Sequence, residues 1–258
     1  MQDLRVTPVQ TALIWEDPAA NRAHFDRLLQ ELPGRTDVVV LPEMFTTGFT
    51  MNPAPVAEPM DGPTVAWMRE QAGRLDAAVT GSLVIEENGA YHNRLVWMRP
   101  DGSYDTYDKR HRFAMAGEHE HYARGNERLV TVWRGWRICP LICYDLRFPV
   151  WARNDDSYDL LIYTANWPDR RAYDWLTLLR ARAIENQCYV VGVNRTGTDA
   201  GGHHYRGDSC VVDPGWRRML WHAAHEPALA TVTLAGSHLA QVRESLPFLR
   251  DRDSFTVG

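Results

Sequence analysis

Cys143 stands where an apolar segment of the sequence stops. Residues 138–142 are apolar, and polar and aromatic residues follow the cysteine at once. A buried strand that ends at a cysteine and bends into a helix brings the sulfur to the carboxyl edge of a sheet, where open α/β sheets place ligand crevices. The positive end of that helix favours a thiolate nucleophile. A small core residue at a strand end is the alternative, because free cysteine is often buried.

Two more ionisable residues, Glu43 and Lys109, follow predicted strands. Glu43 comes directly after the predicted strand 37–42, of which residues 38–42 are apolar, although a carboxylate at such a point is more commonly a solvated loop residue or a helix N-cap. Together with Cys143 they specify a chemistry. The thiolate attacks a carbonyl or nitrile carbon, and the carboxylate takes the thiol proton and later activates water. The charged lysine cannot accept a proton, so we expect it to stabilise an oxyanion together with the backbone N–H of Tyr144.

The overall composition is that of an ordinary globular protein and disfavours several classes of function. The chain has 258 residues, of which 45% are hydrophobic and 24% charged. A net charge of −5 and the lack of a basic run give no attraction to nucleic acid or anionic lipid. No apolar run approaches the roughly 20 residues that span a bilayer, and no signal-peptide pattern opens the sequence. We therefore expect a cytoplasmic protein without a nucleic-acid or membrane partner.

The cysteines and histidines do not form a recognisable metal motif. Cysteines 139, 143, 188 and 210 show no Cys-x-x-Cys spacing and no disulfide framework. The polar segment 110–126 contains Glu118-His119-Glu120-His121, which is one candidate metal cluster. Alternate residues of a loop face opposite ways, however, and the helical His-Glu-x-x-His pattern is absent. We expect neither a metal ion nor another cofactor.

The elements that must position these residues alternate between strand and helix. The pattern around Asp17-Pro18 is an N-cap followed by proline at the first helical position. Wholly apolar strands are typical of a sheet covered on both faces. The hydrophobic patterns predict strands over 4–13, 37–42, 77–85, 91–98, 104–107, 129–133, 136–142, 159–164, 188–193, 210–212, 216–221 and 228–234, and helices from residues 17 and 61, over 149–153 and 172–186, and after 236.

This order predicts one α/β domain over residues 1–258, with 246–258 as a C-terminal tail. We expect a four-layer α-β-β-α sandwich in which mixed sheets lie inside and helices lie outside. The strongest helix, 172–186, should turn one apolar face inward. That face is formed by Trp175, Leu178, Leu179, Ala183 and Ile184.

Three segments around the candidate residues resemble the signatures of the nitrilase, or carbon-nitrogen hydrolase, superfamily. They are Leu41-Pro42-Glu43-Met44-Phe45, Tyr107-Asp108-Lys109-Arg110-His111 and Cys143-Tyr144-Asp145-Leu146-Arg147-Phe148-Pro149. The similarity continues through residues 81–83, 165–168, 182–187, 205–209 and 213–214, so it covers nearly the whole chain in order. The resemblance implies the same α-β-β-α sandwich and a Glu43, Lys109 and Cys143 catalytic triad.

Further roles follow from the resemblance. It implies a second glutamate after the lysine, which we place at Glu118, with Glu120 as the other candidate and a solvated loop acid as the alternative. His111 is expected to pack in its loop rather than act as a base. Asp145 and Arg147 are expected to form an internal ion pair. The resemblance also implies a homodimer or an assembly of dimers.

Within the superfamily, residues 118–122 and 165–168 resemble the bacterial omega-amidase-like branch. The resemblance implies hydrolysis of a small omega-amide of a dicarboxylic or 2-oxo acid, such as 2-oxoglutaramate, through an acyl-thioester. Hydrolysis of nitriles or N-carbamoyl amino acids by the same residues is the alternative, because one scaffold serves several reactions. A non-catalytic scaffold is a third interpretation, which the intact triad disfavours.

A substrate with a distal carboxylate needs a cationic or multi-donor partner in its pocket. We expect that partner to be Arg170 rather than Arg171, because Arg170 is nearer the strand end, with the Tyr173 hydroxyl close by. Phe45 and Trp167 are expected to form the walls that hold the planar amide. Both arginines could instead be solvated at the start of the helix.

Overall fold

The computed structural model describes residues 1–155, 158–215 and 218–256. Its strands form two sheets of seven. The first sheet contains β1 (Leu4–Gln10), β2 (Val38–Val40), β3 (Ala78–Glu87), β4 (Ala90–Met98), β5 (Tyr104–Asp108), β13 (Ala228–Leu229) and β14 (Val232–Leu234). The second contains β6 (Thr131–Trp133), β7 (Trp136–Ile142), β8 (Leu160–Ala165), β9 (Tyr189–Asn194), β10 (Thr196–Thr198), β11 (His204–Val212) and β12 (Met219–Ala224).

Each sheet is mixed, with a parallel centre and antiparallel flanks. Strands β1, β2 and β3 run parallel, as do β7, β8 and β9. The helices are α1 (Pro18–Leu29), α2 (Pro63–Leu75), α3 (Glu118–His121), α4 (Ala172–Asn186) and α5 (Gly236–Ser245). The described residues also form the short 3₁₀ turns η1 (Ala114–Ala116), η2 (Cys143–Arg147), η3 (Asp169–Arg171) and η4 (Phe248–Asp251).

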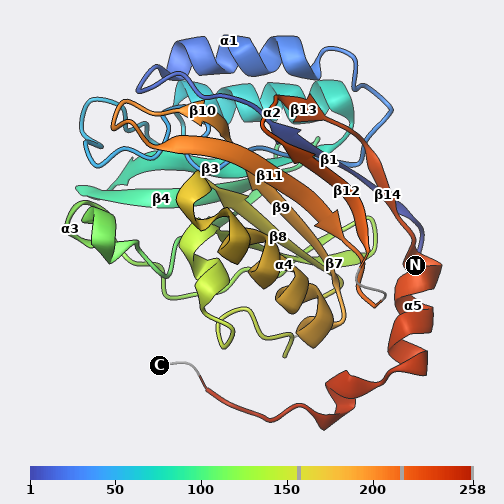
Figure 1. Cartoon of the computed structure of the whole chain (residues 1–258). Helices are drawn as coiled ribbons and strands as arrows, with labels where there is room; N and C mark the ends of the chain where they lie inside the picture. Colours follow the sequence, from blue (N-terminus) through green and yellow to red (C-terminus); the bar gives the residue numbers. More distant parts are fainter. Residues whose placement is uncertain (156–157, 216–217, 257–258) are drawn as a thin grey trace.

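Three apolar layers hold the sheets and helices together. The cluster between the two sheets joins Val6, Val38 and Trp97 of the first sheet to Ile138 and Leu160 of the second. A second cluster lies between the first sheet and helices α1 and α2, and a third lies between the second sheet and α4. Figure 1 shows these helices on opposite outer faces of the paired sheets. The predicted four-layer α-β-β-α sandwich is confirmed.

Helix α4 has the predicted bounds but not the whole predicted face. Trp175, Leu179 and Ala183 are buried, Leu178 is half-buried, and Ile184 is 44% exposed. Ile184 lies about two and a half turns after Trp175, at 3.6 residues per turn, and therefore on the opposite side of the helix. The prediction that Ile184 faces inward was wrong.

Several local elements differ from the sequence predictions. The helix expected over 149–153 is instead a turn, and η2 forms directly at Cys143. The polar segment 110–126 contains η1 and α3, and β10 lies in the expected loop after residue 194. Strand 228–234 is divided into β13 and β14. Residues 216 and 217 of another expected strand lie outside the described residues, and β12 begins at Met219.

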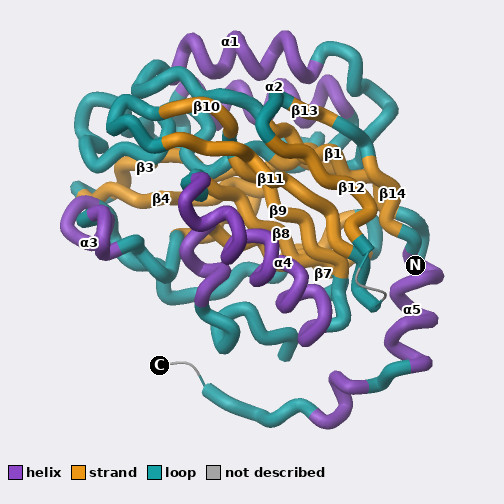
Figure 2. Tube along the Cα trace, in the orientation of Figure 1, coloured by secondary structure: helices purple, strands orange, loops and turns teal. Residues whose placement is uncertain are grey.

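The segment after α5 runs along the outside of the molecule as loop, apart from η4 (Figure 2). Gln187 holds the first residues of this segment in place. The Gln187 side chain donates to the backbone oxygen of Leu246 and accepts from the backbone N–H of Leu249. Within the described residues, no helix is long and apolar enough to cross a membrane.

Candidate active site

Cys143 directly follows β7 and is the first residue of η2, where the backbone is strained. Its φ angle is +43°, in the left-handed region that costs a residue with a side chain about 1–3 kcal/mol. Asp145 holds the turn, because its Oδ2 accepts the backbone N–H of Ile142 at 3.0 Å. The Cys143 side chain is buried yet lines a pocket at the carboxyl edge of the sheet. The turn therefore presents the sulfur to a ligand.

Asp145 does not pair with Arg147, so that expectation was wrong. The fully buried carboxylate accepts from the Tyr107 hydroxyl at 2.7 Å and lies 2.8 Å from Nδ1 of His111. Arg147 instead reaches Asp174 at 2.6 Å. The His111 ring stacks on Phe148 with centroids 3.7 Å apart. The predicted packing role of His111 is confirmed, and the lysine loop is thereby tied to the nucleophile turn.

A buried lysine joins two carboxylates at the centre of the site. Lys109 Nζ lies 2.8 Å from Glu43 Oε1 and 2.9 Å from both carboxylate oxygens of Glu118. Asn93 Nδ2 donates to the same two carboxylates, at 2.9 and 3.1 Å. All three charged side chains are at most 1% exposed, whereas the Glu120 side chain is 68% exposed. Glu118 therefore lies with Lys109 and Glu43 in the buried site, whereas Glu120 faces solvent.

The electrostatics of the site keep the lysine charged and the thiol neutral. Burial lowers the pKa of Lys109, but the charges of Glu118 and Glu43 outweigh it and hold the pKa above the usual value. Burial, reinforced by the charge of Glu43, raises the pKa of the Cys143 thiol. Burial also raises the pKa of Glu118. The helix N-terminus that was expected to favour a thiolate is only a short 3₁₀ turn, and burial overrides it.

A small pocket of about 40 Å³ surrounds the sulfur. Trp167 lines it, as expected, and so does Arg171. Phe45 does not: it lies in the core against Phe25, at a centroid distance of 5.4 Å. Gly81 makes room for it, because a Cβ there would lie 2.9 Å from the Phe45 ring. The assignment of Phe45 as a pocket wall was wrong.

Sequence reasoning missed several residues of this pocket. Phe49 and Phe113 come from irregular loops without periodicity. Asn166 belongs to a segment that carries the family resemblance, and Arg147 is predicted only as a partner of Asp145. All four line the pocket together with the residues already placed there. Their place in the pocket follows from the path of the loops over the sheet edge, which the sequence pattern does not reveal.

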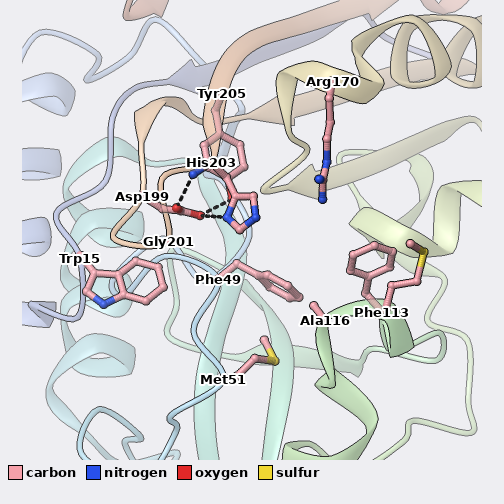
Figure 3. Close-up of a pocket in the computed structure, with 11 residues that line it drawn as sticks. Trp15, Phe49, Met51, Phe113, Ala116, Arg170, Asp199, Gly201, His203 and Tyr205 are labelled. Carbon is pink, nitrogen blue, oxygen red and sulfur yellow. Dashed lines mark hydrogen bonds and ion pairs between the residues drawn. The ribbon is translucent and has the colours of Figure 1, made fainter.

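A larger cavity of about 440 Å³ adjoins the pocket and shares Phe49 and Phe113 with it (Figure 3). Arg170 lines this outer cavity and not the pocket around Cys143. On the far side, Asp199 accepts from the Tyr205 hydroxyl at 2.7 Å. Tyr173 is 80% exposed and lines neither space. The two adjacent arginines therefore line different spaces, Arg170 the outer cavity and Arg171 the pocket around Cys143.

A buried thiol whose pKa a nearby carboxylate raises, together with an ammonium that lines the same pocket, is the set of groups that cysteine-dependent acyl transfer requires. The fold and site define a hydrolase of that class. Residues 5–244 match the carbon-nitrogen hydrolase family, to which the chain belongs as a cysteine-dependent amidohydrolase.

Two relatives and a solved structure match nearly the whole chain. The chain is 47% identical over 257 residues to the omega-amidase YafV of Escherichia coli, covering 100% of both. It is 30% identical to the 2-oxoglutaramate amidase of Bacillus subtilis, covering 95% of this chain and 96% of that one. A CN-hydrolase superfamily protein of Xanthomonas campestris, solved with an arsenic adduct in its active site, superposes with a TM-score of 0.98 at 48% identity, covering 100% of both.

Proposed function

We propose that this chain hydrolyses the omega-amide of a small dicarboxylic or 2-oxo acid, such as 2-oxoglutaramate, to the acid and ammonia. The observation that carries the proposal is a cation of the reactive pocket that contacts the Phe113 ring and has no carboxylate partner among the described residues. Arg171 lines the pocket with Cys143, and among the described residues no carboxylate pairs with it. A distal carboxylate of the substrate supplies the missing partner. Similarity to the omega-amidase of Escherichia coli supports the same substrate class.

In the first half of the reaction, Cys143 is the nucleophile and Glu43 is the base. Glu43 takes the thiol proton as the sulfur attacks the amide carbon. The carbonyl electron pair moves to the oxygen, which becomes an oxyanion between Lys109 Nζ and the backbone N–H of Tyr144. That N–H is one of the first amides of η2, and such groups lack an acceptor within their own helix.

Collapse of the oxyanion then breaks the C–N bond. Glu43 returns its proton to the departing nitrogen, ammonia leaves, and the acyl group remains on Cys143 as a thioester. Water attacks this thioester while Glu43 takes its proton, and a second collapse releases the acid and restores the thiol. Glu118 keeps Lys109 charged and in place throughout, through its contacts at 2.9 Å.

Ammonia release from a panel of small substrates tests the proposed activity. We expect turnover of the omega-amides of 2-oxo acids to exceed that of nitriles and of N-carbamoyl amino acids with the same carbon skeleton. Nitriles lack a carboxamide, and N-carbamoyl amino acids carry their terminal CONH₂ on a urea nitrogen instead of on carbon. Faster turnover of either other group would assign the chain to a different branch of the family.

Arg171→Ala is expected to raise KM for 2-oxoglutaramate about 10- to 100-fold, because a charge-assisted hydrogen bond contributes about 1.5–3 kcal/mol. We thus assign the substrate carboxylate to Arg171 instead of Arg170, because Arg170 lines the outer cavity. Arg170→Ala is the matched control and should have the smaller effect. KM for an uncharged amide of similar length should change little in either variant. A larger effect at Arg170, or equal losses on charged and uncharged amides, would refute the assignment.

We also propose that one catalytic domain spans 1–258, with 246–258 as its tail, and that it forms a homodimer or an assembly of dimers. Support for the single domain comes from the site, which takes Glu43 and Lys109 from the first sheet and Cys143 from the second. Cys143, Cys188 and Cys210 are buried and are not joined in disulfides, which supports a reducing compartment such as the cytoplasm.

Light scattering on wild type and on Ile184→Lys tests the assembly. The outer face of α4 exposes Tyr173 and Ile184, and exposed apolar groups commonly mark an interface. We expect a dimer in wild type and dissociation in Ile184→Lys. The control Val132→Lys replaces a 57% exposed residue on β6 and should remain dimeric. A wild-type monomer near 29.5 kDa at all concentrations would contradict the dimer.

A further inference from the structure

Asn166 lies beside the nucleophile, at the carboxyl end of the neighbouring strand. Ile142 of β7 pairs in register with Thr164 of β8, so the chain leaves both strands at nearly the same level. The backbone N–H of Asn166 donates to Glu43 Oε2 at 2.8 Å, and its side-chain Nδ2 donates to the backbone oxygen of Glu43 at 2.6 Å. Asn166 therefore holds the proposed base from two sides.

These contacts fix the orientation of the Asn166 side chain. The backbone oxygen of Glu43 can only accept, so the amide nitrogen must face it and Oδ1 must point the other way. Oδ1 is buried and has no hydrogen-bond partner, although Asn166 lines the pocket with Cys143 and Lys109. Leaving such an acceptor unsatisfied is costly, so a group that enters the pocket is its natural partner.

Asn93 shows why both observations are needed. It too is buried, donates to Glu43 at 2.9 Å and has an Oδ1 without a partner. It does not line the pocket, however, so a substrate does not reach it. Of these two residues that hold Glu43, only Asn166 combines an unused acceptor with a place in the lining of the reactive pocket.

We propose that Asn166 Oδ1 accepts a hydrogen bond from the N–H of the scissile carboxamide and makes the site selective for amides over esters. Asn166 is then a catalytic residue in contact with the leaving nitrogen. The inference rests on the proposed amide hydrolysis and adds to it the group that recognises the nitrogen. An ester of the same acid presents no N–H at this position and leaves the acceptor unpaired.

The contact strengthens as the reaction proceeds. When Glu43 protonates the nitrogen of the tetrahedral intermediate, that nitrogen gains positive charge. Its hydrogen bond to Asn166 Oδ1 becomes charge-assisted, which makes it shorter and stronger. An interaction that is stronger in the transition state than in the bound substrate increases kcat as well as affinity.

The test compares kcat/KM for 2-oxoglutaramate with that for the omega-methyl ester of the same acid. In Asn166→Ala we expect the amide-to-ester ratio to fall about 10-fold or more relative to wild type. Asn93→Ala is the matched control, because it also removes a donor from Glu43 but leaves the pocket acceptor in place. It should slow both substrates by similar factors and leave the ratio within about 2-fold of wild type.

An unchanged ratio in Asn166→Ala, or an equal fall in both variants, would show that Asn166 acts only through Glu43 and would overturn the inference. If Asn166→Ala does not fold, Asn166→Ser gives the same comparison, because its shorter side chain withdraws the acceptor from the pocket. Wild-type enzyme that releases no ammonia from any omega-amide would refute the proposed substrate instead. The ratio would then be measured on whichever primary amide the enzyme hydrolyses.

Discussion

Cys143→Ala is expected to lower amide hydrolysis on the order of 10⁴-fold or more while leaving the fold intact, since loss of a nucleophile removes the covalent route. Among the described residues that line the reactive pocket, Cys143 is the one thiol. The side chain is buried, and alanine is smaller, so the replacement introduces no steric conflict. Steady-state ammonia release measures the loss, and circular dichroism checks the fold.

Cys210→Ala is the matched control for the nucleophile. Cys210 is also fully buried, but it lies in the core cluster between the second sheet and α4. Its removal should lower the free energy of unfolding by about 1 kcal/mol and leave kcat close to wild type. Iodoacetamide should alkylate Cys143 faster than the other cysteines, and substrate should slow it. Wild-type-like turnover by Cys143→Ala would end the covalent mechanism.

Glu43→Gln is expected to lower kcat at least about 100-fold, because a neutral amide cannot accept the thiol proton or return it to the leaving nitrogen. Lys109→Ala should lose at least as much, since it removes the oxyanion partner. It should also destabilise the fold by about 3–5 kcal/mol, because Glu43 and Glu118 would stay buried without their cation. Chemical denaturation measures the free energy of unfolding and should show the larger loss in Lys109→Ala, since glutamine keeps the shape of glutamate in Glu43→Gln.

The pH dependence of Cys143 alkylation provides an independent test of Glu43. Burial and the charge of Glu43 raise the pKa of the thiol. Glu43→Gln removes that charge, so the midpoint of alkylation should move to lower pH even though turnover falls. Glu120→Gln, at an exposed position, is the control and should change neither measurement. A midpoint that stays in place or rises would contradict the electrostatic coupling of Glu43 and Cys143.

The central residues were predictable from the sequence because strand ends are visible in it. Apolar segments stop at Glu43 and Cys143, and the layer order brings the carboxyl edges of the two sheets together. Helix α4 was predicted with its observed bounds, since its apolar spacing is long and regular. The sequence alone therefore predicts the elements with strong periodicity and the residues at which they end.

The pocket walls were not predictable, because they depend on turns that carry no period. Met44 has a φ of +43°, and this left-handed turn directs the following Phe45 back into the core over Gly81. Likewise, only the short turn η3 decides that Arg171 faces the reactive pocket and Arg170 the outer cavity. Such choices depend on single dihedral angles, which hydrophobic spacing does not encode.

The ion-pair partners of charged residues could not be predicted from the sequence either. Asp145 and Arg147 are close in the chain, yet Asp145 turns inward to Tyr107 and His111 while Arg147 turns outward to Asp174. Sequence proximity suggested a pair that the curvature of η2 prevents. The three-dimensional path of the loops decides which charges meet.

Mass spectrometry of the acid-quenched enzyme during turnover of 2-oxoglutaramate tests the central claim most directly. The account predicts a covalent adduct equal to the substrate minus ammonia, carried on the peptide that contains Cys143 and labile to hydroxylamine, as a thioester should be. The adduct should be absent in Cys143→Ala. An adduct on another residue, or continued ammonia release with no adduct at Cys143 under any quench time, would contradict acyl transfer through this thiol.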